Sequence, residues 1–201
     1  MPDGVGCAVH AGAKLYFRAP DGTQTELCAD MNEAFSQSFT MKGVLYLMDG
    51  KTYRAVRKSS KNTAWEAVSV SGTAYVPTTT ISAAPTGGGT SYEAVNLLTP
   101  KRINTFIGDG TATQFKVDAT DLDATAVTAE VNGSAVTVSA VNRSTGLVTL
   151  AAAPANGNGL ANVSIAFAKT VSGHADKINK CRFAGLYGGK NDTRVFLSGN
   201  P

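Results

Sequence analysis

Apolar and polar residues alternate along much of the stretch 104–171. In "QFKV", for example, Phe115 and Val117 alternate with polar neighbours. Successive side chains of a β-strand point to opposite faces, so this pattern predicts strands with one buried face and one solvated face. In the other strands, the positions expected to face the core are Val127, Ala129, Val131, Val136, Val138, Ala140, Val163, Ile165 and Phe167.

Short turn sequences separate these runs. Asn132-Gly133 is a strong signal for a two-residue hairpin turn, because both residues tolerate a positive φ. "NRSTG" at 142–146 predicts a second turn, and a Pro/Gly/Asn-rich loop covers 154–159. About five strands in so short a stretch predict a small sandwich or barrel with a core of its own. We therefore expect 104–171 to fold alone.

The stretch 1–76 contains two related segments. "GAKLY" at 12–16 and "GVLY" at 43–46 each lead into a strand-like run that ends at an Asp-Gly pair, Asp21-Gly22 or Asp49-Gly50. Asp-Gly between apolar runs is typical of a hairpin turn. A weaker third copy, "GGKNDTRVFLSG", occupies 188–199. Copies spaced by about 30 residues indicate small antiparallel sheets in series, and a β-propeller blade is one such unit.

The stretch 77–103 is rich in residues that break regular structure, and we expect a flexible linker there. It contains Pro77, Pro85, Pro100 and the triple glycine 87–89. A phosphate-binding loop is excluded for the triple glycine, because no Gly-Lys-Ser/Thr follows it.

Together these patterns predict an all-β protein with propeller-like antiparallel blades and an inserted small β-sandwich. The expected divisions are blades in 1–76, a linker in 77–103, the inserted sandwich in 104–171 and a return to the blades in 172–201. Helix is expected only as a turn or two, near Ala29–Ser36 or Ser91–Leu98.

The charge content agrees with strands rather than long solvated helices, since only 16% of residues are charged. A net charge of +3 is too small to indicate nucleic-acid binding by itself. The densest basic run, "RAVRKSSK" at Arg54–Lys61, is interpreted as a solvated strand edge. Phosphate contact is the alternative, without the interleaved aromatic residues that would support it. No segment approaches the roughly 20 apolar residues of a membrane span, so we expect no membrane insertion.

Residues that could carry chemistry are few. His10 and His174 lie in Gly/Ala-rich surroundings and are interpreted as structural, and no Gly-x-Ser-x-Gly elbow is present. Cys7 with His10 resembles half of a metal site that lacks its second half. The three cysteines, an odd and widely spaced set, predict buried, reduced thiols rather than a disulfide framework; they are Cys7, Cys28 and Cys181.

The sequence also contains an acidic cluster and four Asn-x-Ser/Thr triplets. Asp118, Asp121 and Asp123 could form a Ca²⁺ site, but they lack the glycine and closing glutamate of the helix–loop–helix calcium motif, so turn formation is favoured. The triplets are interpreted as chance matches rather than glycosylation sites; they begin at Asn132, Asn142, Asn162 and Asn191. We therefore expect no catalytic residue, no cofactor and no metal.

The stretch 104–171 resembles a β-module that recurs in bacteriophage structural proteins, especially tail proteins. The shared pattern is F-x-G-D-G-T-x-T-x-F, then L-D, V-x-V-N/D-G-x-x-V, x-x-T-G-x-V-T-F, A-P and a strand that ends in Y/F-x-K. The residues that match it are Phe106, Gly108 to Thr111, Thr113, Phe115, Leu122, Asp123, Asn132, Gly133, Val136, Thr145, Gly146, Val148, Thr149, Ala153, Pro154, Phe167 and Lys169.

The flanks of this module, "PTGGGTSYEAVNLLTPKR" and "KTVSGHADKINKCRFAGLYGGKNDTRVFLSGNP", resemble phage and prophage proteins described as DNA-stabilisation or tail proteins. Their name comes from the propeller-containing tail-nozzle proteins of short-tailed phages. The resemblance implies a non-enzymatic virion protein of the tail or head–tail junction, assembled in the host cytoplasm. Its implied partners are copies of itself in a ring, six-fold by analogy with tail nozzles, and other tail or connector proteins. DNA would pass through the channel without sequence-specific binding.

Two other functions stay open at this point. Similar β-modules decorate tail fibres, so an adhesin or receptor-binding module is the main alternative. A carbohydrate-active enzyme on a propeller would need a pair of carboxylates in a pocket. Relatives of this kind run longer at both ends, whereas this chain stops at Asn200-Pro201, where another hairpin is expected. We expect either a longer protein or completion of the last blade by a neighbouring subunit.

Overall fold

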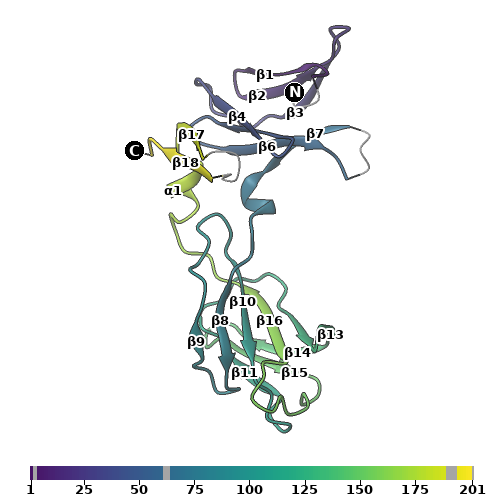
Figure 1. Cartoon of the computed structure of the whole chain (residues 1–201), viewed down its shortest axis with the longest axis vertical. Helices are drawn as coiled ribbons and strands as arrows, with labels where there is room; N and C mark the ends of the chain where they lie inside the picture. The colour runs from purple at the N-terminus through teal and green to yellow at the C-terminus, as the bar shows by residue number, and fades with distance from the viewer. Residues whose placement is uncertain (2–3, 61–63, 189–193, 201) are drawn as a thin grey trace. The chain divides into compact units, whose positions relative to one another are not determined.

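The computed structural model describes residues 1, 4–60, 64–188 and 194–200. Of the described residues, 46% are in strands and 4% in helices, and the strands form several sheets. The prediction of a nearly all-β protein is therefore confirmed. The chain divides into two compact units: unit 1 comprises Met1–Ala74 and Gly173–Pro201, and unit 2 comprises Tyr75–Ser172. Unit 2 is thus inserted between the two segments of unit 1 (Figure 1).

Unit 1 consists of antiparallel sheets whose neighbouring strands follow one another along the chain. The first sheet contains β1 (Cys7–Ala11), β2 (Lys14–Arg18) and β3 (Gln24–Cys28). The second contains β4 (Gln37–Met41), β5 (Val44–Met48), β6 (Tyr53–Lys58) and β7 (Trp65–Ser69). The unit also holds the hairpin of β17 (Phe183–Tyr187) and β18 (Arg194–Ser198), a 3-10 turn, η1 (Val70–Thr73), and a short helix, α1 (Asp176–Asn179).

The two related segments of the sequence form equivalent three-strand meanders. Across the first turn of each, Ala11 pairs with Lys14 in one sheet and Met41 pairs with Val44 in the other. The Asp-Gly pairs lie in the next turn, between β2 and β3 and between β5 and β6. The two meanders share a core, whose fully or nearly fully buried residues are Leu15, Met31, Leu47 and Val56.

Asp49 shows why the turn between β5 and β6 needs an aspartate. Its side chain is buried, and its carboxylate accepts hydrogen bonds from the backbone N–H groups of Asn32 (2.7 Å) and Lys51 (2.8 Å) and from Thr52. Burial raises the pKa of Asp49, but these hydrogen bonds outweigh burial and lower the pKa below its ordinary value. The carboxylate therefore holds the turn closed.

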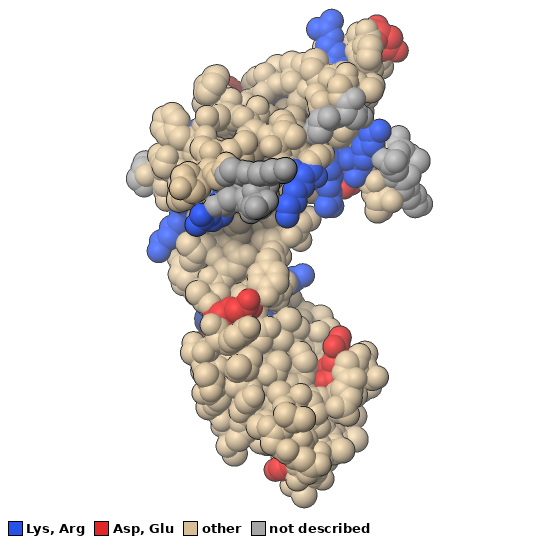
Figure 2. All heavy atoms as spheres, viewed as in Figure 1, with Lys and Arg blue, Asp and Glu red and all other residues tan. Residues whose placement is uncertain are grey.

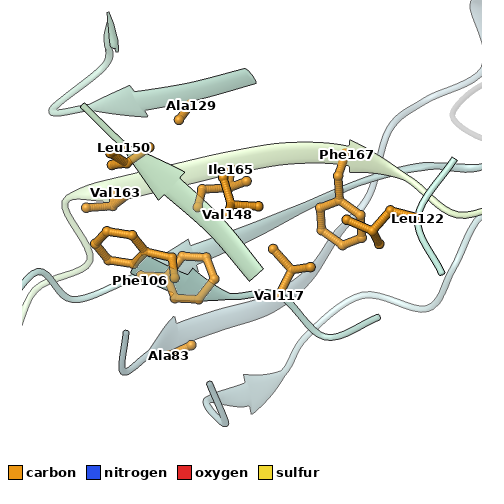
Figure 3. Close-up of a cluster of buried hydrophobic side chains, with 11 residues drawn as sticks. Ala83, Phe106, Val117, Leu122, Ala129, Val148, Leu150, Val163, Ile165 and Phe167 are labelled. Atoms are coloured by element: carbon orange, nitrogen blue, oxygen red, sulfur yellow. The ribbon is translucent and has the colours of Figure 1, made fainter. Parts of the chain in front are cut away.

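Unit 2 is built from two sheets around one core. The six-stranded sheet has the order β13-β12-β16-β10-β8-β9, and the three-stranded sheet has the order β11-β15-β14. Their bounds are β8 Thr78–Ala83, β9 Thr90–Ser91, β10 Lys101–Phe106, β11 Gln114–Lys116, β12 Thr128–Val131, β13 Ser134–Val136, β14 Val138–Asn142, β15 Leu147–Leu150 and β16 Val163–Ala168. Figure 3 shows Val148 and Leu150 of β15 gathered with Phe106, Val163 and Ile165 of the larger sheet.

The expected alternation in unit 2 is confirmed at all but one of its positions. Ala129, Val163, Ile165 and Phe167 are buried, and the four other valines of that set pack against them. Ala140 is exposed instead. The chain leaves the larger sheet after β13 and enters the smaller sheet as β14, with a register shift between Val138 and Ala140 that turns Val141 toward the core. One residue of shift exchanges the two faces of a strand.

The prediction of a flexible linker at 77–103 is wrong for much of this stretch. β8 pairs in parallel with β10, and β9 pairs with β8, so both belong to the larger sheet of unit 2. The β-branched run "TTTI" explains the strand, whereas Pro85 and the glycines occupy only its closing turn. No helix forms at Ala29–Ser36 or Ser91–Leu98; the short helical turns lie at η1 and α1.

Candidate functional site

The three aspartates of the possible Ca²⁺ site serve different parts of unit 2. Asp118 accepts hydrogen bonds from side chains of β8 and β10. Asp123 accepts hydrogen bonds from the backbone N–H and hydroxyl of Thr170, and Asp121 adopts a positive φ in a turn. Within the part of the chain that the structure describes, no group of three or more His, Cys, Asp or Glu residues is placed to hold a metal ion.

The cysteines and histidines are also dispersed. All three cysteines are free thiols, but the prediction that they are buried is wrong for Cys7, which is exposed at the start of the edge strand β1. Cys28 is half-buried and Cys181 is buried, and burial raises the pKa of both thiols. His10 lies on the opposite face of β1 from Cys7, with Nδ1 3.1 Å from Ser36 Oγ.

The basic run Arg54–Lys61 lies mainly in β6, a strand with neighbours on both sides. Arg54 contacts Asp30, and Arg57 Nε lies 3.0 Å from Glu66 Oε1 on β7. The interpretation as a solvated strand edge is therefore wrong for β6, which lies inside its sheet, and the side chain of Arg54 is only 15% exposed. Lys61 lies outside the described residues, as does Asn191 of the fourth Asn-x-Ser/Thr triplet.

Asn162, from another triplet, has a structural task. Its Oδ1 accepts a hydrogen bond from the Gly108 N–H (2.8 Å), and its Nδ2 donates to the Ala155 carbonyl (2.8 Å). A Cβ at Gly108 would lie 2.7 Å from that same carbonyl, so the close approach requires glycine. The asparagine thereby ties the "GDG" turn at 108–110 to the loop before β16.

The most distinctive polar feature of unit 2 is an open cavity of about 690 Å³, here called the Asp118 pocket. It lies beside the turn after β8, the start of β10, the segment after β11 and the end of β16. Its lining comprises Thr80, Ala83, Thr86, Gly87, Gly88, Arg102, Asn104, Lys116, Val117, Asp118, Ala119, Thr120, Lys169 and Val171. A cavity of this size matches the usual range for a small-molecule site, about 300–1,000 Å³.

A polar network fixes Asp118 at this pocket. Its Oδ2 accepts hydrogen bonds from Thr79 Oγ1 (2.6 Å), Thr80 Oγ1 (2.8 Å) and Asn104 Nδ2 (3.0 Å). Asn104 is buried, and its Oδ1 accepts the Asp118 N–H at 2.8 Å. Because Thr79, Thr80 and Asn104 belong to the larger sheet while Asp118 follows β11, the network joins the two sheets.

Three cations line the same pocket. The Arg102 guanidinium lies 5.9 Å from the Phe167 ring centroid, and Lys169 Nζ donates to the Asp121 carbonyl at 2.9 Å. The Lys116 ammonium has no hydrogen-bond or ion-pair partner among the described residues. With Asp118 as the single acid of the lining, the pocket has an excess of two positive charges.

The lining offers cations, a carboxylate and threonine hydroxyl groups, which can bind a polar ligand. The lining has no cysteine or histidine, and its only carboxylate lacks the second carboxylate of a glycosidase pair. Sequence reasoning considered Asp118 and Gly87–Gly89 but missed the rest of the pocket. The sequence feature that could have indicated the pocket is Asn104, because this polar residue lies on the same face of β10 as the core residue Phe106.

Comparison of the chain with protein-family models, with curated proteins and with solved structures finds no match. Among the described residues, no helix has the length and apolar character needed to cross a membrane.

Proposed function

We propose that the chain is a non-enzymatic structural protein of a phage virion, in the tail or at the head–tail junction. In this role, copies of the chain form a ring that closes the channel and helps to retain packaged DNA. The proposal begins from the resemblance of the sequence to phage tail proteins. The observation that carries it further is the strand order of unit 1, in which β4 to β7 form a four-stranded antiparallel meander like a propeller blade.

The first sheet of unit 1 supports the same interpretation. It repeats the first three strands of the second sheet with equivalent turns, as expected for blades in series. The hairpin β17–β18 returns to unit 1 after the inserted unit, where Gln37 of β4 bonds both backbone groups of Ala184. The outermost strand of a blade has unpaired backbone N–H and C=O groups, and such an edge favours pairing with a strand of a neighbouring subunit.

Several residues of the phage-like motif in unit 2 have structural tasks, which supports a role without catalysis. Phe106 and Phe115 meet edge to face in the core, with ring centroids 5.4 Å apart. Asp109 accepts hydrogen bonds from the N–H groups of Ala112 and Thr111, and these bonds lower the pKa of Asp109. These residues of the motif are therefore accounted for by folding.

Charge is unevenly divided between the units. Unit 2 contains five of the 18 Lys and Arg and six of the 15 Asp and Glu, so unit 1 has a net charge of +4 and unit 2 of −1. Figure 2 shows Lys and Arg gathered over unit 1 on the displayed face. A positive surface attracts DNA phosphates regardless of base sequence. We accordingly assign the channel-facing role to unit 1 and an outward position to unit 2.

Two measurements test this proposal. Native mass spectrometry of the purified chain should show a closed cyclic oligomer, and by analogy with tail nozzles a hexamer. Cryo-electron microscopy of the intact particle should place the chain in an axial ring. A protein that remains monomeric and maps to a distal fibre would overturn the ring function.

The second candidate function is a tail-fibre adhesin or receptor-binding module. The Asp118 pocket favours it, because a cavity lined by charged side chains is not needed for ring assembly. The position in the particle distinguishes the two functions: a distal location supports the adhesin, and an axial ring supports the nozzle.

A further inference from the structure

The geometry of the Asp118 pocket points to a binding site for an acidic sugar, meaning a ligand with one carboxylate and several hydroxyl groups. The inference is independent of ring assembly and applies to either proposed function. It starts from two features of the lining: a carboxylate with one oxygen available and a group of cations that outnumbers it.

The Oδ1 atom of Asp118 is available to accept a hydrogen bond from a ligand. Oδ2 already accepts three side-chain hydrogen bonds, whereas Oδ1 has no partner among the described residues. The residue is exposed, so Oδ1 can be reached from the pocket. Since the network holds the carboxylate in place, a hydroxyl of a ligand meets a preorganised acceptor. An anion without a hydroxyl or N–H donor would meet only repulsion at this oxygen.

The cations of the pocket favour a ligand with an anionic group. Lys116 is unpaired among the described residues, and Arg102 is oriented by the Phe167 ring and by a 3.5 Å contact of its Nη2 with the Lys169 carbonyl. Lys169 is partly neutralised by Asp121, 3.9 Å from its Nζ. Lys116 and Arg102 are therefore the groups that would bind a ligand carboxylate.

The turn after β8 holds Lys116 in position. A Cβ at Gly87 would lie 3.2 Å from the Cγ of Lys116, so the glycine lets the lysine stem pack directly on the backbone. The Lys116 N–H also donates to the Pro85 carbonyl at 2.8 Å. Gly87 and Gly88, which the sequence pattern placed in a linker, thus form one wall of the pocket.

Nuclear magnetic resonance titration of the full chain tests this inference. The probes are glucuronate, glucose, sulfate and serine, which separate an acidic sugar from a neutral sugar, a simple anion without a hydroxyl group and a zwitterion. Glucuronate should shift the amide signals of Gly87, Gly88 and Asp118 saturably, and the other three probes should bind about tenfold more weakly or not at all. Equal or tighter binding of sulfate or serine, or shifts confined to other parts of the chain, would overturn the inference.

A matched pair of variants assigns the binding to the pocket. Lys116→Gln removes an ammonium without a structural partner, so the fold should persist while glucuronate affinity falls about tenfold. Lys101→Gln removes an exposed cation outside this pocket and should leave the affinity unchanged. Equal losses in both variants would indicate attraction by net charge alone. Native mass spectrometry should show the same oligomeric state for Lys116→Gln as for the unchanged chain. A loss of glucuronate affinity in this variant would then not be caused by a failure of ring assembly.

Discussion

Removing the Asn104 side chain should destabilise unit 2 strongly, although the residue has no part in the apolar core. Asn104 is 1% exposed, and its amide group contacts Thr79 and Asp118. In Asn104→Ala, the Asp118 N–H loses its acceptor and the Asp118 carboxylate loses one of its three donors. The variant therefore weakens the polar link between the two sheets.

The size of the effect follows from these two losses. A buried N–H left without an acceptor costs about 1–3 kcal/mol, and a hydrogen bond to a charged group contributes about 1.5–3 kcal/mol. Asn104 borders the open Asp118 pocket, so water can replace part of what is lost. We expect the free energy of unfolding of unit 2 to fall by about 3 kcal/mol, a large share of the roughly 5–15 kcal/mol of a typical domain.

The single tryptophan makes the measurement specific to one unit. Trp65 lies on β7 of unit 1, so its fluorescence reports on unit 1, whereas circular dichroism reports on both units. In urea, Asn104→Ala should shift part of the dichroism transition to lower urea and leave the fluorescence transition in place. Asn156→Ala, at an exposed loop position, is the matched control. Equal, small effects of the two variants would refute a stabilising role for the network.

Three further outcomes are expected. Gly146→Ala should lower the thermal stability of unit 2, because Gly146 has a φ of +72° and a Cβ would collide with the Ala119 carbonyl; an unchanged melting temperature would contradict this. Alkylation followed by mass spectrometry should label Cys7 first and Cys181 last, in the order of their exposure, and simultaneous labelling of the native protein would contradict it. Burial, and secondarily the neighbouring Tyr46, raises the pKa of Tyr53 to about 12, so stability should fall as pH rises from the ordinary value of about 10 toward 12. Tyr53→Phe should reduce this loss in a pH series of urea unfolding curves, and an unaltered slope would show that Tyr53 is not its source.

Local patterns predicted the hairpins well because their causes are local. Asn132 and Gly133 both have a positive φ, 49° and 76°, and Val131 pairs directly with Ser134 across the turn. The same holds for the paired meanders of unit 1, whose turns depend on a few adjacent residues. Such elements are specified by turn chemistry and by alternation, both of which are visible in one sequence.

Long-range pairing was not predictable in this way. Pro85 and the triple glycine indicate a turn. The strand "TTTISA" before them was not predicted, because its partner β10 follows about 20 residues later. The Asp118 pocket depends on the same pairing, since Thr79, Thr80 and Asn104 meet Asp118 only when β8 and β10 are neighbours. The network is thus a consequence of topology rather than of any local motif.

That topology changes the expected boundary of the independently folding module. The fragment 104–171 lacks β8 and β9 and the first half of β10, so Asp118 loses both threonine donors and Ala83 is missing from the core. The fragment 75–172 retains every strand of both sheets of unit 2. Expressed separately, 75–172 should give dispersed amide resonances and a cooperative melting transition, and 104–171 should give neither. Well-dispersed spectra from the shorter fragment would show that β8, β9 and the two threonine donors of Asp118 are not needed to hold the sandwich together.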